Sequence, residues 1–184
     1  MAGDRAALIS LLKERSVRFG EFTLASGVRS PYYIDCRLTT MSAPGQVLIG
    51  ALGLQAIRGT GWAPDAIGGL TMGADPVAYA IAAASAATSS PLDAFSVRKE
   101  VKRHGTGRRI EGNFTAGDRV VVIEDVVTSG GSAILAIDAV REEGGTVIGL
   151  LALVDREAGG REKIAAAGVP VCVLVSASEL GIGE

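Results

Sequence analysis

Lysine and histidine are scarce in this chain. Of its 18 basic residues, four are lysine and fourteen are arginine, and the single histidine is His104. Two of the lysines, Lys99 and Lys102, lie with His104 in one short stretch, SVRKEVKRHGTG (residues 96–107). Two interpretations are open for this stretch: an ordinary solvated basic turn, or a segment that must hold a highly charged partner.

Other absences exclude whole classes of protein. Cys36 and Cys172 have neither C-x-x-C spacing nor companion histidines, which argues against a disulfide framework and a structural metal site. No apolar run reaches the length of a membrane span, and the first ten residues lack the apolar core of a signal peptide. A formal net charge of -2 is not typical of a general nucleic-acid-binding protein. We therefore expect a cytoplasmic protein with no nucleic-acid or membrane partner.

A chain of 184 residues, 48% of them hydrophobic and 21% charged, suits one globular domain. Its N-terminal part predicts a helix over residues 4–17 with Asp4 as its cap, followed by two short strands at residues 21–27 and 30–37. A second helix is predicted to begin near Pro44 and to end at residues 59–61. Its predicted inward residues are Val47, Leu48, Ala51, Leu52 and Ile57.

From residue 65 onward, short continuous apolar runs alternate with helical patterns. The runs predict strands at residues 65–70, 93–98, 119–125, 146–155 and 170–175. The helical patterns lie at residues 75–87, 132–144 and 161–168, with Asp75 and Ser132 as predicted caps. Continuous rather than alternating apolar strands indicate an α/β fold, in which helices flank both faces of a parallel sheet. Ligands of such sheets bind beyond the carboxyl ends of the strands, so functional residues should follow them.

The strongest functional signal is VVVIEDVVTSGGSA (residues 120–133). A buried strand ends in Glu124 and Asp125, and a turn of small residues then leads into a helix. Such a turn lets backbone N–H groups converge on a phosphate, whereas the two carboxylates would repel a phosphate and suit hydroxyls or hydrated Mg²⁺. Phosphate beside a diol indicates a ribose phosphate, although a plain strand-to-helix turn with exposed acids is the alternative.

This stretch resembles the phosphoribosyl pyrophosphate (PRPP) motif of the type I phosphoribosyltransferases. The resemblance implies the fold of that family, and it implies PRPP binding by Glu124, Asp125, Val126, Val127, Thr128, Ser129, Gly130, Gly131 and Ser132. It also implies that the loop in GGLTMGADPVA (residues 68–78) holds pyrophosphate, through Thr71, Met72, Gly73 and Ala74. From the residues alone, that second loop is equally an ordinary strand-to-helix turn.

The basic stretch, VRKEVKRHG followed by IEG, is similar to the catalytic loop of orotate phosphoribosyltransferases. The resemblance implies a mobile catalytic loop at about residues 98–112. Pyrophosphate leaves with a build-up of negative charge, so cations should close over it. The predicted catalytic residues, which also bind PRPP, are Arg98, Lys99, Lys102 and His104.

The same resemblance points to the base site. FTLASGVRSPYYIDCR (residues 22–37) is similar to the family segment that covers the base, and Arg156 after the strand at residues 146–155 stands where a cation meets the orotate carboxylate. The predicted orotate-binding residues are Ser26, Tyr32, Tyr33, Thr128 and Arg156. From the residues alone, the two tyrosines are equally core aromatics of a small hairpin. Residues 1–42 are expected to form an N-terminal helix and hood, and residues 43–184 the α/β core.

Together these features imply transfer of phosphoribose from PRPP to orotate in pyrimidine synthesis, by a homodimer that shares its catalytic loops across the interface. Mg²⁺ is expected to arrive with PRPP and to reach Glu124 and Asp125 through water. Several family members carry lysine where this chain has Ala25 and Met72, and Arg29 is a candidate substitute. Two alternatives remain: a type I enzyme for another base, and a non-catalytic PRPP-binding regulator.

Overall fold

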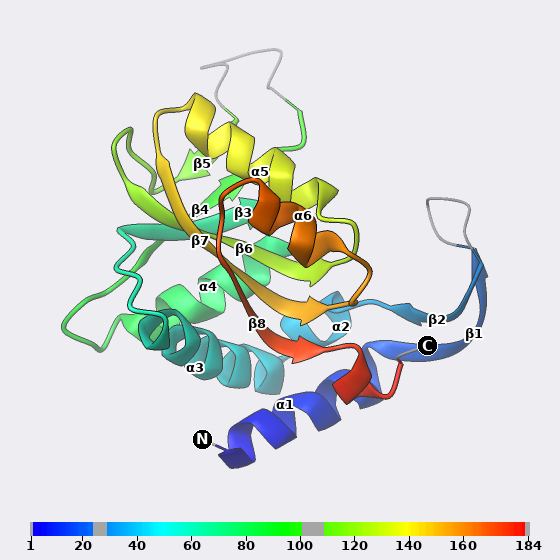
Figure 1. Ribbon diagram of the computed structural model, residues 1–184. Coiled ribbons are helices and arrows are strands. Elements are labelled where there is room, and N and C mark those ends of the chain that lie inside the picture. The colour runs from blue at the N-terminus through cyan, green and yellow to red at the C-terminus, as the bar shows by residue number, and fades with distance from the viewer. Residues whose placement is uncertain (1, 24–28, 101–108, 183–184) are drawn as a thin grey trace.

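The structure, a computed structural model, describes residues 2–23, 29–100 and 109–182 (Figure 1). Its N-terminal part consists of helix α1 (Ala2–Arg15), an antiparallel hairpin of β1 (Val17–Thr23) and β2 (Arg29–Ile34), and a short helix α2 (Arg37–Thr40). The predicted pair of strands is therefore confirmed, although β1 begins earlier than the pattern indicated. The hairpin forms a two-stranded sheet separate from the main sheet.

A six-stranded sheet forms the centre of the remaining chain. Its strands are β3 (Ala66–Leu70), β4 (Asp93–Val97), β5 (Ile110–Gly112), β6 (Arg119–Val127), β7 (Thr146–Asp155) and β8 (Val171–Ser176). They lie in the order β5–β4–β3–β6–β7–β8, and all neighbours are parallel except β5, which is antiparallel to β4. β3 is buried at every position, as expected for a strand covered on both faces. The predicted α/β fold is confirmed.

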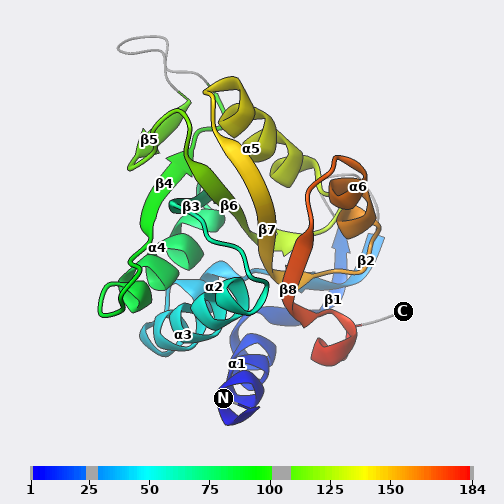
Figure 2. The same ribbon diagram turned by 60° about the vertical axis from the view of Figure 1, so that its left-hand side comes forward.

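Helices cover both faces of this sheet (Figure 2). α1, α3 (Ala43–Gly59) and α4 (Ala74–Ser85) pack on one face, where Leu12, Ile49 and Ile81 belong to one buried cluster. α5 (Gly131–Glu142) and α6 (Gly160–Ala166) pack on the other face, in a second cluster that contains Ile137 and Ile164. A short 3₁₀ turn, η1 (Ser178–Leu180), follows β8. Within the residues that the structure describes, no helix is both long and apolar enough to span a membrane.

The strand order creates a switch point between β3 and β6. From β3 the chain continues outward through α4 to β4 and β5, whereas from β6 it continues in the opposite direction through α5, β7 and α6 to β8. The loops after β3 and β6 therefore lead away from each other and leave a crevice between them. In open α/β sheets, this crevice at the carboxyl ends of the strands is where ligands bind.

Three helices begin before the predicted caps. α1 begins at Ala2, so Asp4 lies in its first turn, and Val17 pairs with Ile34 in the hairpin instead of ending the helix. The N-caps of α4 and α5 are Gly73 and Gly130, and neither provides a side-chain capping hydrogen bond. Asp75 and Ser132, which the sequence predicted as caps, lie inside these helices, and Asp75 accepts a hydrogen bond from Ser96 Oγ at 2.7 Å. The N-terminal ends of α4 and α5, each with a glycine N-cap, face the switch point.

The inward face of α3 also differs from the prediction. Val47, which is 73% exposed, and Ala51 point outward, whereas Ile57 is buried as predicted. The reason is close packing against α4: a Cβ added at Gly50 would lie 2.5 Å from the carbonyl oxygen of Ala80. Because α3 is apolar on both sides, its glycine-bearing side decides which face meets the neighbouring helix.

Candidate active site

A cavity of about 690 Å³ opens at the switch point. Its walls come from the ends of β3 and β6, the segment after β2, Lys99 after β4, and Arg156 after β7. Residues from five separate parts of the sequence thus meet in one cavity, and four of these parts follow strands that end at one edge of the main sheet, as the predicted parallel sheet requires. A second cavity of about 600 Å³, between α1, α3 and β8, is mostly apolar and contains none of the predicted site residues.

Two adjacent carboxylates lie on β6, which continues beyond them to Val127. Burial, and then the charge of Asp125, raises the pKa of Glu124 from 4.5 to about 8. Glu124 Oε2 is buried and has no hydrogen-bond partner within the described part of the chain. Burial also raises the pKa of Asp125, against the opposing effect of a 2.9 Å hydrogen bond from the Val126 N–H to its Oδ1. A buried acceptor without a partner suits a hydroxyl donor or a cation.

The loop after β3 lies directly beside these acids. The Thr71 N–H donates to the Val97 carbonyl at 2.8 Å, and the peptide bond between Thr71 and Met72 is cis. Gly73 has no room for a side chain, because an added Cβ would lie 2.5 Å from Asp125 Oδ1. The loop and the acid pair therefore form one wall of the cavity.

The turn after β6 forms the next wall. Thr128 and Ser132 line the cavity, and between them Gly130 adopts a left-handed conformation with φ of 73°. The turn rests on Gly160, the first residue of α6, where an added Cβ would overlap the carbonyl oxygen of Thr128. This contact was not predicted from the sequence, although the Gly159–Gly160 pair was an available signal. With no side-chain cap on α5, the first N–H groups of this helix are left for another acceptor.

Cationic side chains complete the site. The guanidinium carbon of Arg156 lies 4.9 Å from the centre of the Tyr32 ring, and Arg156 Nε is buried without a hydrogen-bond partner among the described residues. The Arg37 guanidinium donates two hydrogen bonds to Asp35, from Nε to Oδ1 at 2.8 Å and from Nη2 to Oδ2 at 2.9 Å. Lys99 lines the same cavity. Acids and cations that line one cavity suit a ligand that carries both hydroxyls and anionic groups.

Known proteins are similar to this chain in sequence. A family model described as the phosphoribosyl transferase domain matches residues 46–173. An orotate phosphoribosyltransferase of Aquifex aeolicus is 48% identical over 180 residues, which are 96% of this chain and 97% of that protein. The chain belongs to the orotate phosphoribosyltransferase family.

Solved structures of orotate phosphoribosyltransferases match nearly the whole chain. The Mycobacterium tuberculosis enzyme in complex with Fe(III) dicitrate is 43% identical with a TM-score of 0.85, covering 97% of this chain and 99% of that one. The enzyme of the same organism in complex with PRPP is 39% identical with a TM-score of 0.82, at the same coverage. The predicted type I phosphoribosyltransferase fold is confirmed.

Many residues that were predicted from the family motifs line the cavity, but Ala74 and Val127 are buried, and Ser129, Gly130 and Gly131 are not among its lining residues. Tyr33 lines it, whereas Tyr32 packs partly against the core beneath Arg156. Arg98 does not line it, and its Nε instead pairs with Glu111 Oε1 at 3.0 Å. The cavity also contains residues that the sequence analysis did not select: Asp35, Cys36 and Arg37. Their signal was a polar run directly after a strand. Ser26, Lys102 and His104 lie outside the described residues.

The acid pair can hold Mg²⁺ only together with other ligands. Within the part of the chain that is described, no group of three or more His, Cys, Asp or Glu side chains could hold a metal by itself. Mg²⁺ often uses one or two protein carboxylates, several waters and substrate phosphates. Glu124 and Asp125 fit that pattern, since one buried oxygen of Glu124 is without a partner.

Proposed function

We propose that this protein transfers the phosphoribosyl group of PRPP to orotate, producing orotidine 5′-monophosphate and pyrophosphate in pyrimidine biosynthesis. The observation that carries the proposal is one cavity that contains an uncapped glycine-rich turn, a buried carboxylate pair and the guanidinium of Arg156. A phosphate, a ribose and the carboxylate of orotate each require one of these features. The likeness to a relative whose structure contains PRPP supports the same conclusion.

The ribose phosphate is assigned to the end of β6. Backbone N–H groups of residues 128–132 and the start of α5 would bind the 5′-phosphate, since the left-handed Gly130 turns the chain so that these groups converge. Glu124 and Asp125 would accept hydrogen bonds from the ribose hydroxyls. The partnerless Glu124 Oε2 would then gain the donor that it lacks.

The leaving group is assigned to the loop after β3. As the bond between C1 of the ribose and the pyrophosphate oxygen breaks, a bond forms from C1 to a ring nitrogen of orotate, which releases its proton, with inversion through an oxocarbenium-like state. Thr71, Met72 and Gly73, with the backbone of the following Ala74, would hold the departing pyrophosphate, and Lys99 lines the same cavity. Arg98, Lys102 and His104 are proposed from the family motif to close over it. Opening the Arg98–Glu111 ion pair would release Arg98 for that role.

Orotate is assigned to the space beneath the hairpin. Arg156 would pair with its carboxylate, and Tyr33 would cover its ring, with Tyr32 holding the guanidinium from behind. Thr128 and Ser26 are the further proposed contacts. In this view residues 1–42 act as a hood over the base, and residues 43–184 are the catalytic core.

Mg²⁺ is proposed to enter with PRPP. Phosphoribosyltransferases generally use Mg²⁺ with this substrate, and here Glu124 and Asp125 would hold it, directly or through water. When bound, the ion would neutralise charge that develops on the departing pyrophosphate. The side chains of the protein would orient the two substrates, which can supply several of the ~7–11 kcal/mol available from orientation.

We also propose a cytoplasmic homodimer whose loops at about residues 98–112 are shared between subunits. Leu38, Met41 and Met72 are exposed apolar side chains that line a shallow hollow next to the active site. Grouped apolar side chains of this kind often mark an interaction surface. The two free thiols, Cys36 and Cys172, are in keeping with a reducing compartment.

The proposed reaction is tested by pyrophosphate release from PRPP in the presence of single bases. Orotate should support release, whereas uracil, adenine and hypoxanthine should support little, because none of them carries the carboxylate that Arg156 would recognise. Release with a purine but not with orotate would favour the alternative of another base. PRPP binding without turnover on any base would favour a regulator.

A further inference from the structure

We propose that Glu157 is a positioning residue for Arg156, and that it acts through the C-terminal turn η1. The proposal rests on the assignment of Arg156 to the orotate carboxylate. Glu157 directly follows Arg156 and, among the described residues, is the one non-glycine residue with a positive φ, 57°. A residue with a Cβ is disfavoured in this conformation, so surrounding contacts must hold it there.

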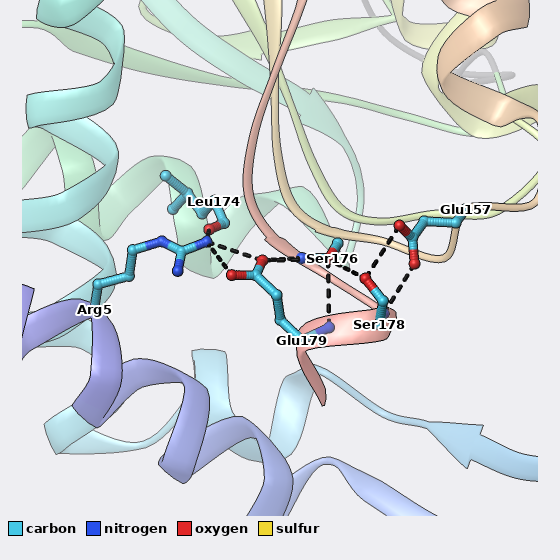
Figure 3. A network of polar contacts seen from close by, with 6 residues as sticks. All are labelled: Arg5, Glu157, Leu174, Ser176, Ser178 and Glu179. Carbon is cyan, nitrogen blue, oxygen red and sulfur yellow. Dashed lines mark hydrogen bonds and ion pairs between the residues drawn. The ribbon is translucent and has the colours of Figure 1, made fainter. Parts of the chain in front are cut away.

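Hydrogen bonds hold Glu157 from two directions. Its N–H donates to Oδ1 of the buried Asp155 at 2.9 Å. Its carboxylate accepts two hydrogen bonds from Ser178, one from the backbone N–H at 2.8 Å and one from Oγ at 3.2 Å (Figure 3). The side chain of Glu157 therefore points to η1 and away from the active site.

The segment of residues 155–157 also determines the position from which the Arg156 side chain extends. The Arg156 N–H donates to the Val127 carbonyl at 2.9 Å, at the start of the proposed phosphate turn. The Ala177 N–H donates to the Asp155 carbonyl at 2.8 Å. Residues 155–157 are thus attached to β6 on one side and to the start of η1 on the other. Both backbone flanks of Arg156 are therefore attached, and from this position its guanidinium lies over the Tyr32 ring.

η1 is itself anchored and is therefore a firm support. The Glu179 carboxylate accepts from the Ser176 N–H at 3.0 Å and pairs with Arg5 of α1 at 2.7 Å. Arg5 also donates to the Leu174 carbonyl of β8 at 2.9 Å. Figure 3 shows these contacts as one continuous network from Arg5 to Glu157. Helix α1 and strand β8 thereby support Glu157, and through it Arg156, the residue that precedes it.

Glu157 is exposed and does not line the cavity, so a direct contact with substrate is not part of the proposal. Its removal should alter where Arg156 lies and leave the PRPP walls intact. The expected signature is a change in orotate recognition alone. A general role in folding would instead lower the amount of active enzyme, and hence kcat, for every substrate.

The decisive variant is Glu157→Gly. Glycine tolerates the left-handed conformation, so the turn is retained while the contacts with Ser178 are lost. The KM for orotate should rise about tenfold, equivalent to ~1.4 kcal/mol, whereas the KM for PRPP and the melting temperature should stay near wild-type values. Glu157→Gln keeps one acceptor for the Ser178 N–H, so its KM for orotate should lie between those of the wild type and Glu157→Gly. Glu162→Ala, the matched control, removes an exposed carboxylate from α6 and should leave both KM values unchanged.

Arg156→Ala separates this proposal from the proposed function. If it raises the KM for orotate while Glu157→Gly does not, the role of Glu157 is refuted and the base assignment stands. If Arg156→Ala leaves that KM unchanged, the base assignment itself fails. In the double variant, Glu157→Gly should add nothing to Arg156→Ala, because it acts through the missing side chain. Additive losses, or a fall in kcat with a lower melting temperature, would also overturn the positioning role.

Discussion

Gly73 lies against the carboxylate of Asp125 so closely that an added Cβ would come within 2.5 Å of Asp125 Oδ1. Gly73 follows β3, and Asp125 lies in the neighbouring strand β6; the parallel register of these strands pairs Gly68 with Val122. The loop that we assign to pyrophosphate therefore packs directly against one of the acids that we assign to ribose. A change at Gly73 should therefore affect the binding of both the pyrophosphate and the ribose of PRPP.

Gly73→Ala should weaken PRPP binding with little loss of stability. The added methyl group must displace either Asp125 or its own loop, and each movement shifts the loop relative to the acid pair. We expect the Kd for PRPP, measured by calorimetry, to rise about tenfold or more, a loss of ~1.4 kcal/mol. Gly59→Ala is the control, since an added Cβ there has nothing within 4 Å. Wild-type affinity in Gly73→Ala would contradict the coupling.

Asp125→Asn and Lys102→Ala should fail in different ways. Asp125 is assigned to the ribose in both the bound substrate and the transition state, so its loss should weaken PRPP binding as well as turnover. Lys102 is assigned to the departing pyrophosphate, so kcat should fall by ~10²–10³, as for a lost oxyanion donor. Steady-state kinetics of the two variants make the comparison. A Lys102→Ala variant that changes only KM would contradict the leaving-group role.

Mixing these two inactive variants tests whether the loop is shared. If Lys102 serves the site of the neighbouring subunit, each heterodimer contains one site with both residues intact and one site that lacks both. Half of the dimers are then heterodimers, so about a quarter of wild-type activity should return after subunit exchange. If each loop serves its own subunit, every site lacks one group and mixing restores no activity.

The buried acid pair should make the stability of the unliganded protein depend on pH. The pKa of Glu124 rises from 4.5 in the unfolded chain to about 8 in the folded protein, because burial and the charge of Asp125 disfavour its ionised form. The folded protein therefore holds a proton that the unfolded chain releases. The stabilising contribution is full below about pH 4.5, and it is lost as the pH rises to about 8.

Glu124→Gln should remove this contribution. Urea unfolding between about pH 5 and about pH 8 should show the variant gaining stability over the wild type as the pH rises, by at most ~1.4 kcal/mol per pH unit for one proton. The difference between the two proteins is the readout, since groups that do not interact with Glu124 or Asp125 titrate equally in both. A constant difference across this range would contradict the raised pKa of Glu124.

The sequence by itself determined the sheet and most of the chemistry near it. Continuous apolar runs such as residues 119–123 are local patterns, and so are the acids and small residues that follow them. Because the side chains at the end of a buried parallel strand meet others at the same edge, their gathering could be predicted without knowing the strand order. The helix caps were harder to predict. Gly73 and Gly130 are the N-caps of α4 and α5, whereas the capping preferences of the side chains favoured Asp75 and Ser132.

Only the tertiary structure decided which distant residues touch. The contact of Gly73 with Asp125, the support of the Thr128 turn by Gly160, and the hydrogen bonds between Glu157 and Ser178 all join separate segments. Such contacts depend on the order β5–β4–β3–β6–β7–β8 and on how closely each helix packs, and no local pattern encodes either. The choice of the glycine-bearing side of α3 has the same cause, because a helix that is apolar on both sides acquires its inward face only when a neighbour packs against it.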